Sequence, residues 1–118
     1  MKQKAVDSYT GKNGMRLNCA QAVAMAAKEA YHVTDAEIEA LGCCGGGRAP
    51  GGVCGAIHAV RELLKKKSVH DADTALAEFE RVIGDLHCKV IKGAKKHSCM
   101  ECVAEAAALA ERFSRSRT

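Results

Sequence analysis

SCMECVAEAAALAERF, residues 98–113, is the stretch of sequence that most clearly decides the fold. Ser98 is a favourable N-cap residue, and Glu101 follows it three positions later, as in a capping box. After this start, small and apolar residues recur at helical spacing on one face, namely Cys99, Val103, Ala106, Ala110 and Phe113. The stretch therefore predicts a helix whose inward face begins with a cysteine.

The remainder of the chain also indicates helices, which glycine and polar breaks separate. Two further capping boxes, Asn18 with Gln21 and Thr34 with Glu37, predict helix starts. Besides the helix that begins at Ser98, we expect helices over about 2–11, 18–30, 35–41, 52–67 and 71–86. No segment gives a convincing strand pattern. We therefore predict an all-α fold, a compact bundle of about five to six short helices with a glycine-rich, cysteine-bearing loop.

Length and composition fit a single domain over residues 1–118. With 47% hydrophobic and 27% charged residues, the chain lacks the composition of a disordered protein. Its core must be built mostly from small residues that allow close helix packing, because there is no Trp and alanine is abundant. The aromatic residues are Tyr9, Tyr31, Phe79 and Phe113.

The net charge of +4 does not indicate a nucleic-acid-binding protein. No basic stretch alternates with aromatic residues, as a base-stacking surface requires. Lysines such as those at 65–67 are instead expected at the C-terminal ends of helices, where cations favour the helix dipole. The chain contains neither a signal-peptide core nor an apolar stretch long enough to cross a membrane, so we expect a cytoplasmic protein without a membrane partner.

Seven cysteines in 118 residues are the strongest functional signal in the sequence. An odd number without a secretory signal argues against a disulfide scaffold and favours metal binding, redox chemistry or reactive thiols. Cys19, Cys54 and Cys99 each fall in the first turn of an expected helix, where unpaired amides and the helix dipole favour the thiolate. Cys88 follows the end of another helix. The alternative for any one cysteine is a buried, inert side chain, and we leave this open for Cys43, Cys44 and Cys102.

Three further features lie around these cysteines. The glycine-rich loop 42–52 lacks the Gly-Lys-Ser/Thr ending of a phosphate-binding loop, but its successive amides favour anionic sulfurs. Cys99 and Cys102 form a CxxC pair, and Cys102 is expected either to share the side of Cys99 or simply to pack. His58 follows Cys54 by one helical turn, so it is a candidate metal ligand or proton relay, or else a polar residue near the site or a solvated side chain.

The cysteine pattern resembles the redox-active family named for its C-GCAxxG-C-C signature, over roughly residues 17–113. The matching segments are 18–23 (NCAQAV), 45–47 (GGG), 52–56 (GVCGA), Cys88, and Cys99 with Val103 and Ala106. In this chain Ala59 replaces the last glycine of the family motif. The resemblance implies a working set of Cys19, Cys54, Cys88 and Cys99, and a similar domain in split-Soret cytochromes c implies that such a set can hold an iron–sulfur centre.

Three hypotheses follow for the function. The first is an iron–sulfur cluster of the two-iron type, held by the four cysteines of that set, which carries or senses electrons. Glycine amides would then support the cluster, at Gly45, Gly46, Gly47, Gly52 and Gly55. The second is a metal-free thiol–disulfide oxidoreductase or sensor with Cys54 and Cys99 as its partners. The third is a structural zinc site. Cys43, Cys44, Cys102 and His58 are additional candidate ligands, and a redox partner protein and a homodimer are the expected assemblies.

Overall fold

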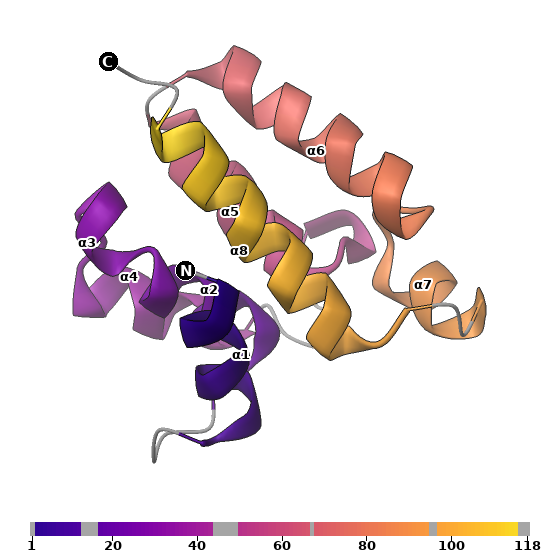
Figure 1. Ribbon diagram of the computed structural model, residues 1–118, viewed down its shortest axis with the longest axis horizontal. Coiled ribbons are helices and arrows are strands. Elements are labelled where there is room, and N and C mark those ends of the chain that lie inside the picture. Colours follow the sequence, from indigo (N-terminus) through magenta and orange to yellow (C-terminus); the bar gives the residue numbers. More distant parts are fainter. Residues whose placement is uncertain (1, 13–16, 44–49, 67, 95–96, 116–118) are drawn as a thin grey trace.

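Helices account for all the regular secondary structure in the part of the chain that the computed structural model describes, which is residues 2–12, 17–43, 50–66, 68–94 and 97–115. This confirms the all-α prediction, although the described residues form eight α-helices rather than five to six. They are α1 (Lys2–Thr10), α2 (Cys19–Ala26), α3 (Lys28–Tyr31), α4 (Asp35–Ala40), α5 (Gly55–Lys65), α6 (Val69–Ile83), α7 (Cys88–Ala94) and α8 (Cys99–Arg115) (Figure 1). Two short 3₁₀ turns, η1 (Leu41–Cys43) and η2 (Pro50–Gly52), flank the glycine-rich loop.

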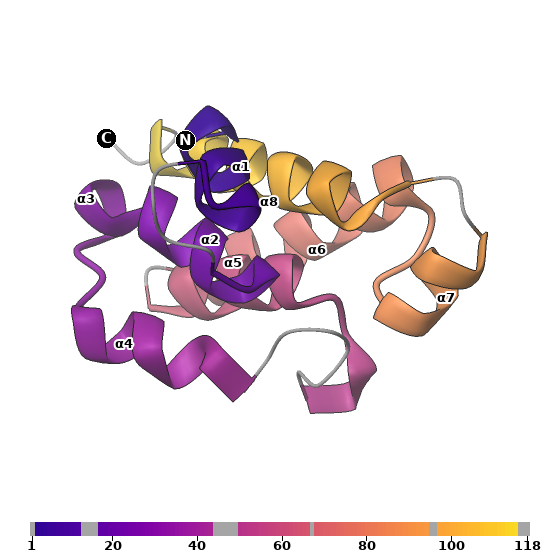
Figure 2. The same cartoon turned by 90° about the horizontal axis from the view of Figure 1, so that it is seen from below.

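Helix α5 lies at the centre of the bundle. It packs against α2, α6 and α8, and α1 covers α2 and α8 on the outside. Figures 1 and 2 show α5, α6 and α8 running side by side, with the short α7 beyond one end of this layer. None of the described helices is both long and apolar enough to cross a membrane.

The core is built mainly from alanine and β-branched residues, as the composition predicts. Phe79 is the largest side chain that is completely buried, and Ile57, Leu64, Val23 and Val60 follow it in size within the same core cluster. Such small side chains let helix axes approach closely. The core is therefore stabilised by close packing between helices rather than by clusters of aromatic side chains.

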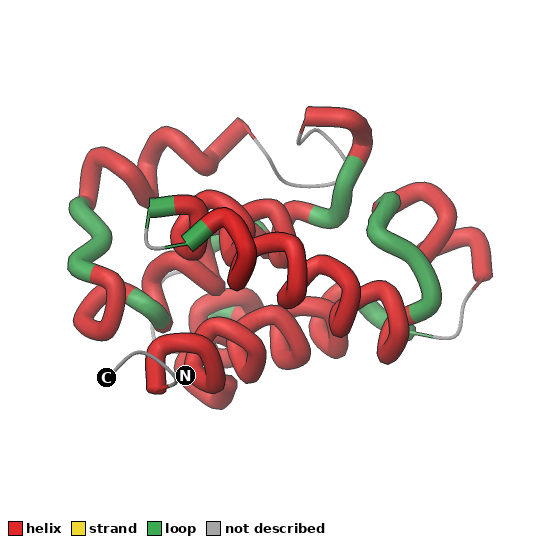
Figure 3. The backbone as a smooth tube through the Cα atoms, turned by 90° about the horizontal axis from the view of Figure 1, so that it is seen from above, coloured by secondary structure: helices red, strands yellow, loops and turns green. Residues whose placement is uncertain are grey.

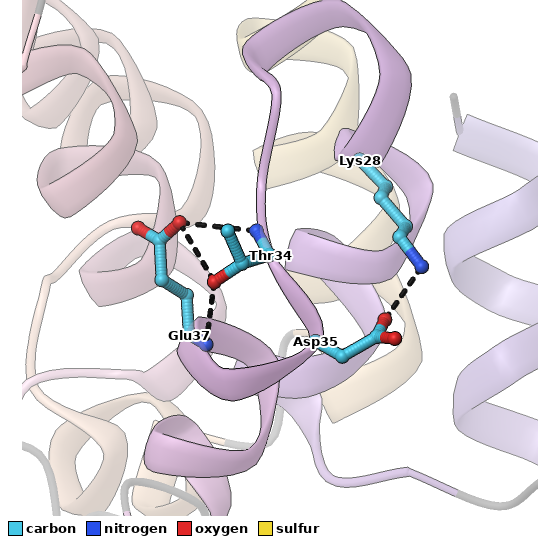
Figure 4. A network of polar contacts seen from close by, with 4 residues as sticks. All are labelled: Lys28, Thr34, Asp35 and Glu37. Carbon is cyan, nitrogen blue, oxygen red and sulfur yellow. Dashed lines mark hydrogen bonds and ion pairs between the residues drawn. The ribbon is translucent and has the colours of Figure 1, made fainter.

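All three predicted capping boxes are present. The Asn18 side chain accepts a hydrogen bond from the amide of Gln21 at 2.8 Å, and the side chain of Gln21 accepts one in return from the amide of Asn18 at 3.3 Å. Thr34 with Glu37 and Ser98 with Glu101 repeat the arrangement. Figure 4 shows the second box at the start of α4, beside the ion pair of Lys28 with Asp35. These helix starts are local features, which explains why the sequence predicted them.

Several predicted helix boundaries are wrong, and glycine accounts for two of them. Helix α5 begins at Gly55 rather than near Gly52, because Gly51 and Gly52 have positive φ angles of 76° and 73°. Helix α6 ends at Ile83 rather than at Leu86, because Gly84 adopts a left-handed conformation with φ of 106°. The helix expected over 18–30 is divided into α2 and α3 by a turn at Ala27.

Helix α7 was not predicted, and its position determines where Cys88 lies. Just before it, His87 pairs with Val53 in an isolated antiparallel β-bridge, and the Cys54 amide donates to the Leu86 carbonyl at 2.7 Å. Figure 3 shows the described backbone as helices and connecting loops, without a strand. The bridge ties the segment that enters α5 to the segment that enters α7, so that the next residues along each segment, Cys54 and Cys88, are brought together.

Candidate functional site: a four-cysteine cluster

Four cysteines line one small cavity where the N-terminal ends of α5, α7 and α8 meet. They are Cys54, Cys88, Cys99 and Cys102, and Ile91, Lys92 and His97 complete the lining. The cavity is only about 10 Å³, roughly the room that one water-sized particle needs. Four thiols from three separate segments of the chain therefore share one confined space.

Cys54 occupies the N-cap of α5, one residue before the helix, rather than within the predicted first turn. Its thiol is buried, with 6% of the residue exposed. The pKa of Cys54 is lowered from its ordinary value of 9.0 to about 7, chiefly by a hydrogen bond from the Cys102 thiol. The backbone amides of Ile57 and Ala56 and the charge of Lys92 lower this pKa further, against the opposing effect of burial. Cys54 is thus the cysteine of this cluster that the structure favours as a thiolate.

Cys102 and Cys88 differ from Cys54 in the direction in which their pKa values are shifted. The pKa of Cys102 is strongly raised, because its thiol donates to the Cys54 sulfur and because it is buried. Burial also raises the pKa of Cys88. Cys54 and Cys102 therefore form a thiolate and thiol pair in which one proton is shared between two sulfurs.

Lys92 and His97 belong to the site, although the sequence reasoning did not assign either of them a role there. Lys92 lies one helical turn after Cys88 on α7, and its charge lowers the pKa of both Cys54 and Cys88. The Nδ1 of His97 lies 3.2 Å from the Glu101 carboxylate. The four-residue spacing of Cys88 and Lys92 places both side chains on one face of a helix. The sequence could have indicated this only if Gly84 had been taken as the end of one helix and Cys88 as the start of the next.

The structure brings together three of the four cysteines that the resemblance implies, and adds Cys102. Cys19 begins α2 and is half-buried, but it does not line the cavity. Cys99 is also only half-buried, whereas Cys102 is buried and faces the cavity with it. None of the five cysteines whose side chains the structure describes forms a disulfide; these are Cys19, Cys54, Cys88, Cys99 and Cys102.

Other predicted site residues lie elsewhere or outside the described part of the chain. Predictions for Cys44 and for Gly45, Gly46 and Gly47 fall outside it, and so does the side chain of Cys43. Gly52 belongs to the turn before α5, and Gly55 is the buried first residue of α5. His58 is buried, which excludes a solvated side chain, and it lines a different cavity.

The donor set suits a thiophilic metal centre in its chemistry. Four cysteine sulfurs are a ligand set for zinc and for iron–sulfur clusters. Among the described residues, however, no three His, Cys, Asp or Glu side chains are placed to share one metal ion. In this structure the four sulfurs surround a cavity with room for a single small particle, so a multi-atom cluster would require them to move apart.

Comparison of the chain with protein-family models, curated proteins and solved structures found no match. The resemblance to the C-GCAxxG-C-C family therefore stays a prediction that rests on the cysteine pattern.

Proposed function

We propose that this chain is a redox protein that binds an iron–sulfur cluster of the two-iron type through Cys54, Cys88, Cys99 and Cys102. The observation that carries the proposal is the convergence of four cysteines from three segments on one cavity. A dithiol site requires two sulfurs, whereas a cluster of this type takes four. When bound, the cluster supplies one-electron transfer.

The residues of the chain contribute three properties to such a site. The amides at the start of α5 and the charge of Lys92 favour anionic sulfur at Cys54. Apolar neighbours such as Ile91 limit water at the cavity. Binding of a cluster requires the sulfurs to move apart. Because helix α7 makes few contacts with the other helices, Cys88 is the ligand that can move outward with least loss of packing.

A redox partner protein would approach from the side of α7 and α8. Cys99 is the half-buried member of the cluster, and Val90 on α7 and Met100 on α8 are 51% and 44% exposed. These exposed apolar groups on the helices that carry the cysteines suit a transient protein contact.

A metal-free thiol–disulfide function is the second candidate, and the shared proton of Cys54 and Cys102 favours it. In that case the Cys54 thiolate attacks and Cys102 is the nearest partner for a disulfide, instead of the Cys99 that the sequence suggested. Oxidation of the pair to a disulfide releases two electrons, and an external disulfide accepts them as it is reduced to two thiols. A structural zinc site is the remaining alternative.

The decisive experiment is an anaerobic purification with a visible spectrum and with iron, acid-labile sulfide and zinc analyses on the same sample. The cluster proposal expects visible colour with stoichiometric iron and sulfide. Colourless, iron-free protein that also fails reconstitution refutes it; bound zinc then indicates the structural site, and absence of zinc indicates dithiol chemistry.

Single substitutions test which four cysteines bind the proposed cluster. The geometry predicts that Cys102→Ser lowers the iron content after reconstitution and that Cys19→Ser leaves it unchanged. The reverse result would return Cys19 to the ligand set, as the family resemblance implies. Thermal unfolding of both variants shows whether a loss of iron reflects a loss of folding.

A further inference from the structure

A cavity that does not include the cysteines lies between α4 and α5. It has a volume of about 470 Å³, within the usual range for small-molecule sites. Its lining is mostly apolar and includes Val33, Leu41, Ala59 and Leu63. The bundle thus has a second cavity, with room for a small organic molecule.

His58 supplies a hydrogen-bond donor to this cavity. The residue is only 6% exposed and belongs to the lining. Its Nδ1 lies 2.8 Å from the Arg61 guanidinium, which can only donate, so Nδ1 is the acceptor and the proton of the ring is on Nε2. No second hydrogen bond of this ring is present within the described residues. The Nε2–H group is therefore a donor on a largely buried residue of the cavity lining, and water or a ligand can supply its acceptor.

The four charged side chains of the cavity lining form two ion pairs, and Arg61, outside the lining, also contacts Glu62 at 3.8 Å. Glu37 forms an ion pair with Lys66, and Glu62 forms one with Lys65 at 3.5 Å. The capping box of α4 fixes the Glu37 carboxylate, since the amide and the hydroxyl of Thr34 both contact it (Figure 4). Burial and the nearby Arg61 lower the pKa of His58, so the imidazole adds no charge at neutral pH. A neutral ligand therefore fits this cavity better than an anion does.

We propose that this cavity binds a small neutral carbonyl compound of the quinone type, with a carbonyl oxygen accepting a hydrogen bond from His58 Nε2. The apolar lining accommodates the body of such a molecule. His58 follows Cys54 by four residues on α5, a rise of about 6 Å, so the compound would lie one helical turn from the cysteine cluster. The choice of a quinone over another neutral carbonyl compound rests on the proposed redox function; the binding site itself does not.

Tetramethylbenzoquinone is a suitable probe, because its fully substituted ring resists addition of cysteine thiols. Titration into the protein as isolated, followed by methyl NMR signals of the cavity lining, is expected to give a Kd of about 1 mM or tighter. Tetramethylbenzene has nearly the same shape but no acceptor, so it is expected to bind about fivefold to tenfold more weakly, the effect of one hydrogen bond. Tetramethylbenzoate tests the preference for a neutral molecule.

Protein variants locate the binding. His58→Leu is expected to remove the difference between the quinone and the hydrocarbon, whereas His70→Leu, on the exposed surface of α6, keeps it. Ala40→Phe places a large side chain at the exposed end of α4, in the lining of the cavity, and is expected to weaken binding of both probes. Because Ala40 is exposed, this variant tests the cavity even if His58→Leu fails to fold.

Three results would overturn the proposal: no binding of the quinone, equal binding of the quinone and the hydrocarbon to the unmodified chain, or tighter binding of the benzoate. None of these results depends on the iron content, which the purification experiment measures separately. A failure of the cavity proposal is therefore distinguishable from a failure of the cluster proposal.

Discussion

Replacing Cys102 with alanine removes the thiol that hydrogen-bonds the Cys54 sulfur, which is the largest influence on the pKa of Cys54. In the metal-free, reduced protein this pKa is about 7, so about half of Cys54 is thiolate at pH 7. A hydrogen bond to a charged group contributes about 1.5–3 kcal/mol, which corresponds to about 1–2 pKa units. We expect the pKa of Cys54 in Cys102→Ala to rise to about 8–9, and the thiolate fraction at pH 7 to fall to about 1–10%.

The suitable assay is a pH titration of cysteine Cβ chemical shifts by NMR, which reports the thiolate at each site. Alkylation rates are less informative here, because Cys54 is only 6% exposed and access of the reagent would limit them. Cys102→Ser retains a hydroxyl donor and is expected to give an intermediate midpoint. Cys19→Ala lies outside the cavity and serves as the matched control, with an unchanged midpoint.

Two results would refute this reasoning. A Cys54 midpoint near 9 in the unmodified protein would mean that the helix amides, Lys92 and Cys102 together do not stabilise the thiolate. An unchanged midpoint in Cys102→Ala would mean that the amides of Ala56 and Ile57 stabilise it without the neighbouring thiol. The first result would remove the distinction between one anionic and one protonated sulfur, and the second would show that Cys102 is not its cause.

Three further predictions concern charge, backbone and capping. Lys92→Met is expected to raise the NMR-titration midpoints of Cys54 and Cys88 in the metal-free protein, whereas Lys89→Met, whose charge is not among the influences on these two thiols, leaves them unchanged. Gly84→Ala is expected to lower the free energy of unfolding in urea by about 1–2 kcal/mol, because Gly84 has a φ of 106°. Gly93→Ala is the control: Gly93 lies in α7 with open space around it, so this change is expected to raise the free energy of unfolding by up to about 1 kcal/mol. Asn18→Ala is expected to cost about 1–2 kcal/mol in the same assay, because Asn18 caps α2 and also donates to the carbonyls of η1; a loss below about 0.5 kcal/mol would contradict this role.

The three helix starts with capping boxes were predicted because such boxes depend on neighbours in the sequence. The boxes at Asn18, Thr34 and Ser98 each satisfy backbone donors through a side chain three residues away, so the required signal is local. The inward position of His58 was not predictable in this way. It depends on a cavity between α4 and α5, two helices that are separated in the sequence by the glycine-rich loop.

The sequence by itself determined that the chain is helical and that cysteines gather at helix starts, since periodicity, capping and glycine breaks are properties of short segments. Only the tertiary structure decided which cysteines meet. The pairing of Val53 with His87 brings Cys54 to Cys88, and the packing of α8 on α5 adds Cys99 and Cys102, while Cys19 begins a helix that does not reach this cavity. Contacts between distant segments depend on how the whole core packs, and the spacing of residues along one helix does not contain that information.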